Sequence, residues 1–153
     1  MLLISACNRT GSIDSEAAVG PATYAVVIDR FVPMATAAEP LRVAFVTAVG
    51  DETLSLEEQV AVIDALATTH DVRFVDDPGA AFDPDLPDSP PRDDGVLIGV
   101  GKISGESPHT VRVEVYTGTG EIDAQLVTLS WRAGAWVIDS VEPVEPEALI
   151  GDE

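Results

Sequence analysis

The sequence predicts an α+β fold in which two helices pack on one face of a curved antiparallel sheet that ends in a C-terminal β-meander. Two observations lead to this prediction. Apolar residues recur at helical spacing only in the first half of the chain, whereas the second half consists of short segments that alternate apolar and polar residues between turns. This order is typical of helices gathered on one side of an antiparallel sheet.

The chain is expected to open with a helix followed by a strand. The helix is predicted over residues 21–32, because Gly20 and Pro21 suit a helix start and Pro33 stops the helix. Its apolar face carries Tyr24, Val27, Ile28 and Phe31. The largely apolar run 41–49 then indicates a buried strand.

A second helix is predicted after Ser55. Ser55 and Glu58 have the spacing of a capping box, in which each side chain accepts a hydrogen bond from the other residue's backbone N–H. We expect four side chains of this helix to face the core: Leu56, Val60, Ile63 and Ala67.

The remaining strands are expected to pair antiparallel. They are predicted over residues 72–75, 95–103, 110–117, 121–131 and 136–141. In the third of them Val111, Val113 and Val115 should face inward, and Arg112, Glu114 and Tyr116 should lie on a face open to water.

The last two strands should form a bent hairpin. The apolar face of 121–131 changes sides near Leu126, which indicates a bulge or bend there. We expect an even-numbered loop, because that places Trp131 and Trp136 opposite each other on one face.

The chain divides into three parts. Residues 1–20 are interpreted as the remnant of a signal peptide and a flexible tether, 21–143 as a single α+β domain, and 144–153 as an acidic tail. At 153 residues, with 46% hydrophobic content, one core is expected. The order of elements resembles the cystatin-like and NTF2-like folds in outline, and such folds host both binding modules and enzymes.

The cysteine Cys7 indicates where the protein works. The run Ile4-Ser5-Ala6-Cys7 resembles the lipobox of bacterial lipoproteins, which implies export and acylation of Cys7. A complete leader has a basic stretch and a longer apolar stretch, so we expect one upstream of Met1. The resemblance implies a lipid-anchored protein on the extracytoplasmic side of the cell envelope.

The charge of the chain restricts its partners. The net charge is −19, and the eight basic residues, of which Lys102 is the only lysine, are scattered along the sequence. Nucleic acid is therefore not expected as a partner, because phosphate binding needs clustered cations. The same charge repels anionic lipid, so membrane contact is expected only through the lipid anchor.

Candidate sites for chemistry are few. In the acidic segment 76–95, Asp83, Asp85 and Asp88 could direct several carboxylates at one Ca²⁺ ion, although the segment also suits a solvated, proline-stiffened loop. His70 is expected to cap the end of the second helix, and His109 is expected in a loop facing solvent. Acid–base catalysis would need buried carboxylates, for which the candidates are Asp29, Asp64, Asp123 and Asp139, although surface positions are the rule for Asp.

Aromatic residues offer one more binding hypothesis. Tyr116, Trp131 and Trp136 could form an exposed stacking platform, or could pack in the core against the helices. The sequence thus predicts a non-catalytic module that binds a protein or a small ligand at the cell envelope. The alternatives are a small NTF2-like enzyme that uses an Asp in an apolar pocket, and a calcium-stabilised surface domain.

Overall fold

The computed structural model describes residues 18–32, 41–50, 54–86, 90–116 and 122–145. Within them, six strands form one sheet in the order β2-β1-β3-β4-β5-β6. The elements are α2 (Pro21–Phe31), β1 (Arg42–Ala48), α3 (Leu56–Leu66), β2 (His70–Phe74), the 3-10 helices η1 (Pro78–Ala81) and η2 (Arg92–Asp94), β3 (Val96–Val100), β4 (His109–Tyr116), β5 (Ile122–Arg132) and β6 (Ala135–Pro143).

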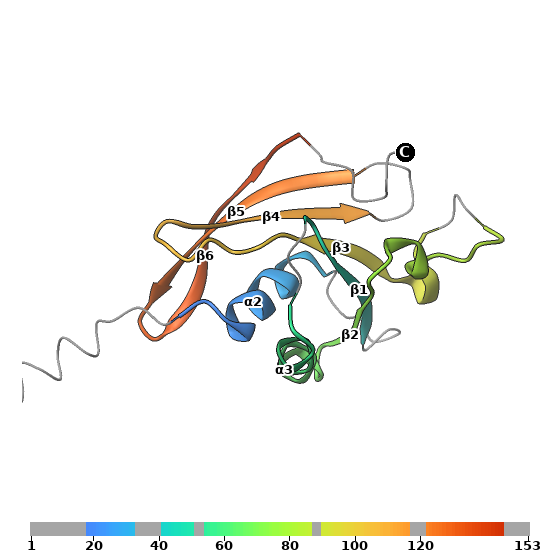
Figure 1. The fold of residues 1–153 in the computed structure, drawn as a ribbon, viewed down its shortest axis with the longest axis horizontal. Coiled ribbons are helices and arrows are strands. Elements are labelled where there is room, and N and C mark those ends of the chain that lie inside the picture. Colours follow the sequence, from blue (N-terminus) through green and yellow to red (C-terminus); the bar gives the residue numbers. More distant parts are fainter. Residues whose placement is uncertain (1–17, 33–40, 51–53, 87–89, 117–121, 146–153) are drawn as a thin grey trace, which may run out of the picture.

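Both α-helices pack on one face of the curved sheet (Figure 1), which confirms the predicted α+β class. The helix α2 begins as expected, with Gly20 as N-cap and proline in the first turn. Its fully buried Val27 and Ile28 join Val46, Val62 and residues of all the later strands in the main core. Strands β3 to β6 form the expected antiparallel meander.

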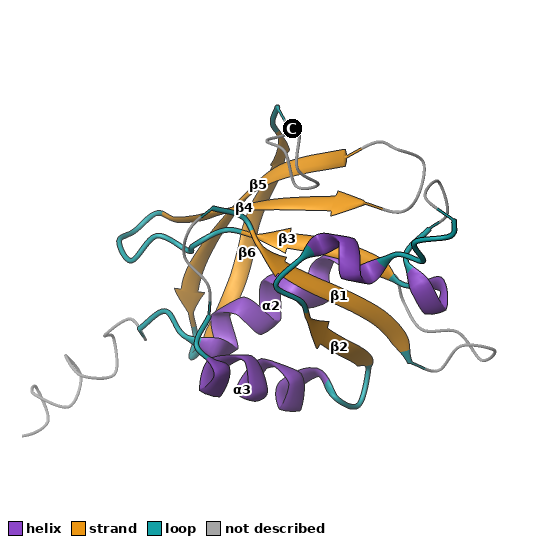
Figure 2. Cartoon of the chain, turned by 45° about the vertical axis from the view of Figure 1, so that its right-hand side comes forward, coloured by secondary structure: helices purple, strands orange, loops and turns teal. Residues whose placement is uncertain are grey.

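Strands β2 and β3 differ from the prediction, because each pairs parallel with β1. The sequence led us to expect both in the antiparallel part. The helix α3 connects β1 to β2 and carries the chain back along the sheet (Figure 2), so the next strand runs in the same direction as β1. The carboxyl ends of three neighbouring strands consequently meet at one edge of the sheet.

The buried face of α3 agrees with the prediction only in part. Its capping box forms, since the Ser55 N–H donates to Glu58 Oε2 at 2.8 Å and the Glu58 N–H donates to Ser55 Oγ at 3.2 Å. Ile63 packs against the main core as predicted. The fully or nearly buried side chains, however, are Val62 and Leu66, whereas Leu56 is 76% exposed. Apolar residues lie on two overlapping stripes of this helix, and packing against α2 and β2 selects the stripe through Val62.

The sheet face opposite the helices is covered, not open to water. Phe45, Ala81, Leu97 and Tyr116 form a second buried cluster there. Phe82 packs edge to face on Tyr116, with ring centroids 5.1 Å apart. The prediction that Glu114 and Tyr116 face water is therefore wrong, since they are 0% and 7% exposed. Ala81 and Phe82, at the end of η1, cover the Tyr116 ring.

The same covered face holds charged side chains of β4. Glu114 is fully buried, and its Oε1 lies 3.9 Å from Nη2 of Arg112, which also donates a hydrogen bond to the carbonyl oxygen of Glu145. These contacts connect the middle of β4 to Glu145, just after β6.

Basic residues brace this second face. The guanidinium carbons of Arg73 and Arg92 each lie 5.6 Å from the centroid of the Phe45 ring. Hydrogen bonds to Asp71 and then to Asp93 raise the pKa of Arg73. Although scattered in the sequence, these cations come together in the fold and are held by acceptors of their own chain.

The bulge predicted near Leu126 lies further along and on the partner strand. The register between β5 and β6 shifts between Thr128 and Leu129, and the extra residue is Asp139 on β6. The two apolar faces of β5 have another cause. Its first residue, Ile122, packs on the second cluster, and its later residues Val127 and Leu129 pack in the main core.

Candidate functional site

A cavity of about 590 Å³ opens at the carboxyl ends of β1, β2 and β3. Its wall contains residues 46–48 of β1, 74–76 at the end of β2 and 100–103 at the end of β3 and just after it. Parts of α2 and the first turns of α3 complete the wall. Ligands of α/β sheets usually bind outside the carboxyl ends of parallel strands, where the connections diverge. The volume is in the range of small-molecule sites.

The inner wall of the cavity is apolar. Ile28 of α2, Val46 of β1 and Ile103 after β3 line it, and all three are at most 3% exposed. These side chains belong to the main core, so the wall is rigid.

Polar groups of the lining are held in place by hydrogen bonds to the backbone. The Tyr24 hydroxyl accepts from the Ile103 N–H at 3.2 Å, and Gln59 Nε2 donates to the Leu54 carbonyl at 3.0 Å. Glu58 is fixed by the capping box of α3. The cavity is therefore a preformed site with an ordered polar lining.

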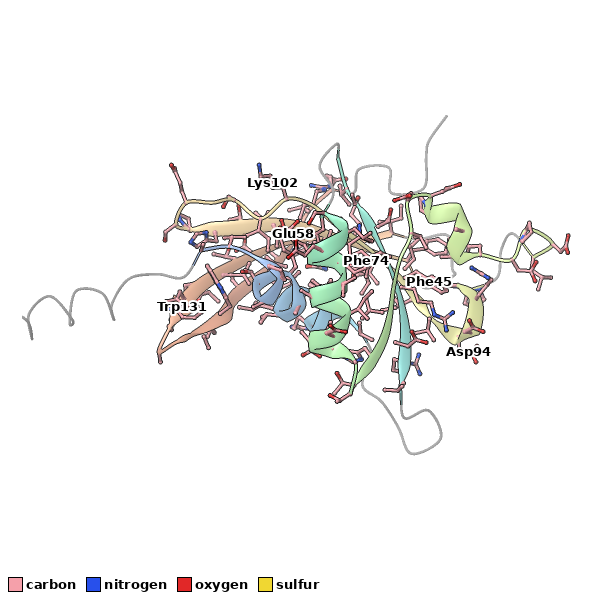
Figure 3. The ribbon with its side chains drawn as sticks, turned by 60° about the horizontal axis from the view of Figure 1, so that its bottom comes forward. Phe45, Glu58, Phe74, Asp94, Lys102 and Trp131 are labelled. Atoms are coloured by element: carbon pink, nitrogen blue, oxygen red, sulfur yellow. The ribbon has the colours of Figure 1, made fainter. Side chains whose placement is uncertain are left out.

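Among the described residues, the charged side chains that line the cavity are Glu58, Asp76 and Lys102. Figure 3 labels Glu58 at the start of α3 together with Phe74 and Lys102, two further lining residues. Two carboxylates and one ammonium give this lining a net negative charge.

The calcium hypothesis concerns a different part of the molecule. Asp83 Oδ1 accepts a hydrogen bond from the Asp85 N–H at 2.9 Å, so this carboxylate closes its own turn. Asp88 lies outside the described residues. In the part of the chain that the structure describes, no three Asp, Glu, His or Cys side chains gather as metal ligands would. Cys7 also lies outside the described part.

Both histidines are placed differently from the prediction. The helix α3 ends at Leu66, and His70 is the buried first residue of β2, with Nε2 at 2.7 Å from Asp29 Oδ1. His109 is 2% exposed and is not a solvent residue. Its Nδ1 lies 2.8 Å from the Ser104 carbonyl oxygen. The His70 imidazole thus joins β2 to α2, and the His109 imidazole joins β4 to the loop after β3.

The three candidate aromatic residues do not form one exposed platform. Tyr116 lies in the cluster on the second face, whereas Trp136 lies in the main core and Trp131 packs against that core. Tyr116 and Trp136 are each only 7% exposed. The alternative of packing in the core against the helices describes Trp136, whereas Tyr116 is buried on the opposite face of the sheet.

None of the carboxylates proposed for acid–base chemistry lines the cavity. Asp29 is paired with His70, and Asp139 Oδ1 lies 2.6 Å from Arg132 Nη2. Asp64 and Asp123 are exposed on α3 and β5. The residues that line the cavity were missed because strand ends distant in the sequence build it. The local signal was the capping box that opens α3, the helix that follows the buried strand β1.

Comparisons of the chain with protein-family models, with curated proteins and with solved structures found no match.

Proposed function

We propose that the protein is a non-catalytic binding module that holds a small organic ligand in the cavity at the carboxyl ends of β1, β2 and β3. The observation that supports this proposal most strongly is a cavity of about 590 Å³ that combines a buried apolar wall with fixed polar groups. Sites of this construction bury most of a ligand and orient it with a few polar contacts.

The hydrogen bonds that hold the polar groups of the lining favour ligand binding. The Tyr24 hydroxyl and the Glu58 carboxylate each accept a hydrogen bond from the backbone. A ligand would meet side chains that already have a set orientation, which lowers the entropy cost of binding.

An enzyme that uses an Asp in an apolar pocket is the second candidate, because Asp76 and Phe74 both line the cavity. Asp76 is solvent-exposed, whereas this candidate enzyme needs its carboxylate inside an apolar pocket. Mass spectrometry of each bound compound after prolonged incubation separates the two candidates. Recovery of the unchanged compound supports binding, and a product that is lost in Asp76→Asn supports the enzyme.

The proposed location is the cell envelope, with the domain attached to the membrane through acylated Cys7. The run Ile4-Ser5-Ala6-Cys7 and the polar segment after it support this proposal. None of the helices among the described residues has the length and apolar character needed to cross a bilayer. Mass spectrometry of protein from its native host tests the anchor. Acylated Cys7 at the N-terminus is expected, and an unmodified thiol would contradict the proposal.

The binding function is tested by thermal unfolding in the presence of small organic compounds. A ligand that binds only the folded chain raises the midpoint, and the rise grows with ligand concentration. The variant Val46→Trp places a large ring in the cavity from its apolar wall and should abolish the rise in the midpoint. Val137→Trp, on the exposed face of β6, should retain the rise. An equal rise in both variants would contradict binding in the cavity.

A further inference from the structure

We infer that the ligand carries a protonated amine on an apolar body, and that Glu58 is the principal group that binds the amine. This inference rests on the proposed binding function, since it names the chemical class of ligand that the same cavity takes. It is carried by the charges of the lining, by the start of α3 and by the apolar inner wall.

Electrostatics favour a cation. Among the described lining residues, Glu58 and Asp76 are acidic and Lys102 is basic, and the chain as a whole has a net charge of −19. A cavity with apolar walls concentrates the field of the charges that line it. An ammonium group is therefore attracted to the mouth, and a carboxylate or phosphate is repelled.

The start of α3 does not serve as an anion site. A helix N-terminus beside the carboxyl end of a strand commonly binds phosphate through its free N–H groups. Here the Glu58 N–H donates to Ser55 Oγ, and Glu57 and Glu58 place two negative charges in the first turn. The Glu58 carboxylate in turn accepts from the Ser55 N–H, so both N–H groups of the capping box are already paired, and acidic residues in the first turn interact favourably with the helix dipole.

Glu58 can bind an amine while it caps the helix. Its Oε2 accepts from the Ser55 N–H at 2.8 Å, and a carboxylate has about four acceptor positions. The side chain is partly buried and lines the cavity, so an amine there would be shielded from water more than at an exposed Glu. The apolar wall of Ile28, Val46 and Ile103 would contact an alkyl or aromatic body.

The test compares three probes of the same length with the full chain by isothermal titration calorimetry: octylamine, octanol and octanoate. At physiological ionic strength, where surface charges are screened beyond about 8 Å, octylamine should bind at least about tenfold more tightly than octanoate. Octanol should bind with intermediate affinity, because it shares the apolar body and lacks the charge.

Two variants separate the local contact from the charge of the whole protein. Glu58→Gln keeps the capping box, which accepts Gln at this position, and should weaken octylamine binding about 3- to 10-fold while leaving octanol binding unchanged. Glu57→Gln removes the same charge from the same helical turn at an exposed position outside the lining, and it should leave both affinities unchanged.

Each result has one reading. Equal losses in Glu58→Gln and Glu57→Gln, or octanoate binding as tight as octylamine binding, would overturn the amine inference. Octanol binding in the same experiment would still support the proposed function. Failure of all three probes to bind would overturn both.

Discussion

The indole rings of Trp131 and Trp136 pack edge to face across the final hairpin, with centroids 5.7 Å apart and planes at 66°. The two residues are register partners, and the next pair is Arg132 with Ala135. The loop between them therefore has two residues, Ala133 and Gly134, with φ of 52° and 81°. Positive φ at both positions is the geometry of a type I′ turn.

Ala133 is the strained residue of this turn, because a Cβ disfavours positive φ and Asn tolerates it better. Ala133→Asn should therefore raise the free energy of unfolding by about 0.5–1 kcal/mol. Urea denaturation followed by tryptophan fluorescence measures the change. Gly134→Ala should lower the stability by a similar amount, and a destabilising Ala133→Asn would contradict the assigned turn.

The two tryptophans should differ in their contributions to stability. Trp136 is 7% exposed and also packs edge to face on His109, whereas Trp131 is only partly buried. Trp136→Ala should cost about 3–5 kcal/mol, and Trp131→Ala clearly less. Chemical denaturation measures the loss in free energy of unfolding for each variant. Equal losses would contradict the deeper burial of Trp136.

Local interactions made part of this fold predictable from the sequence. The capping box of α3 joins residues three positions apart, and the pairing of Trp131 with Trp136 follows from alternation along two adjacent strands. Both depend on neighbours in the sequence, so their residue types carry the signal.

Long-range packing decided the features that the sequence did not reveal. The parallel pairing of β1 with β2 and β3 depends on the path of the connections across the sheet. The burial of Glu114 depends on the segments that cover the second face. The cavity requires strand ends about 26 residues or more apart to meet.

The exposed stripe of α3 provides a further test. Leu56→Ala should change the free energy of unfolding by less than about 0.5 kcal/mol, since Leu56 is 76% exposed. Val62→Ala should cost about 2 kcal/mol, because Val62 is fully buried in the main core. A larger loss of stability in Leu56→Ala than in Val62→Ala would show that Leu56 faces the core, as the sequence pattern predicted.

Gly95 is needed where η2 leads into β3. A Cβ on Gly95 would lie 2.9 Å from the Val43 carbonyl oxygen and 3.2 Å from Phe45 Cε2. Gly95→Ala should therefore destabilise the protein by about 1–3 kcal/mol, because backbone must move to relieve the contact. Gly105→Ala is the matched control, since a Cβ there meets no atom within 4 Å. Equal stability of the two variants would contradict the close approach.

The binding proposal is tested most directly by titration of the ¹⁵N-labelled full chain with octanol, followed by amide chemical shifts. Saturable shifts should concentrate at residues 46–48, 74–76 and 100–103, where the three parallel strands end at the cavity. Shifts confined to the Trp131–Trp136 hairpin or to the exposed side of α3, or no saturable shifts, would contradict it.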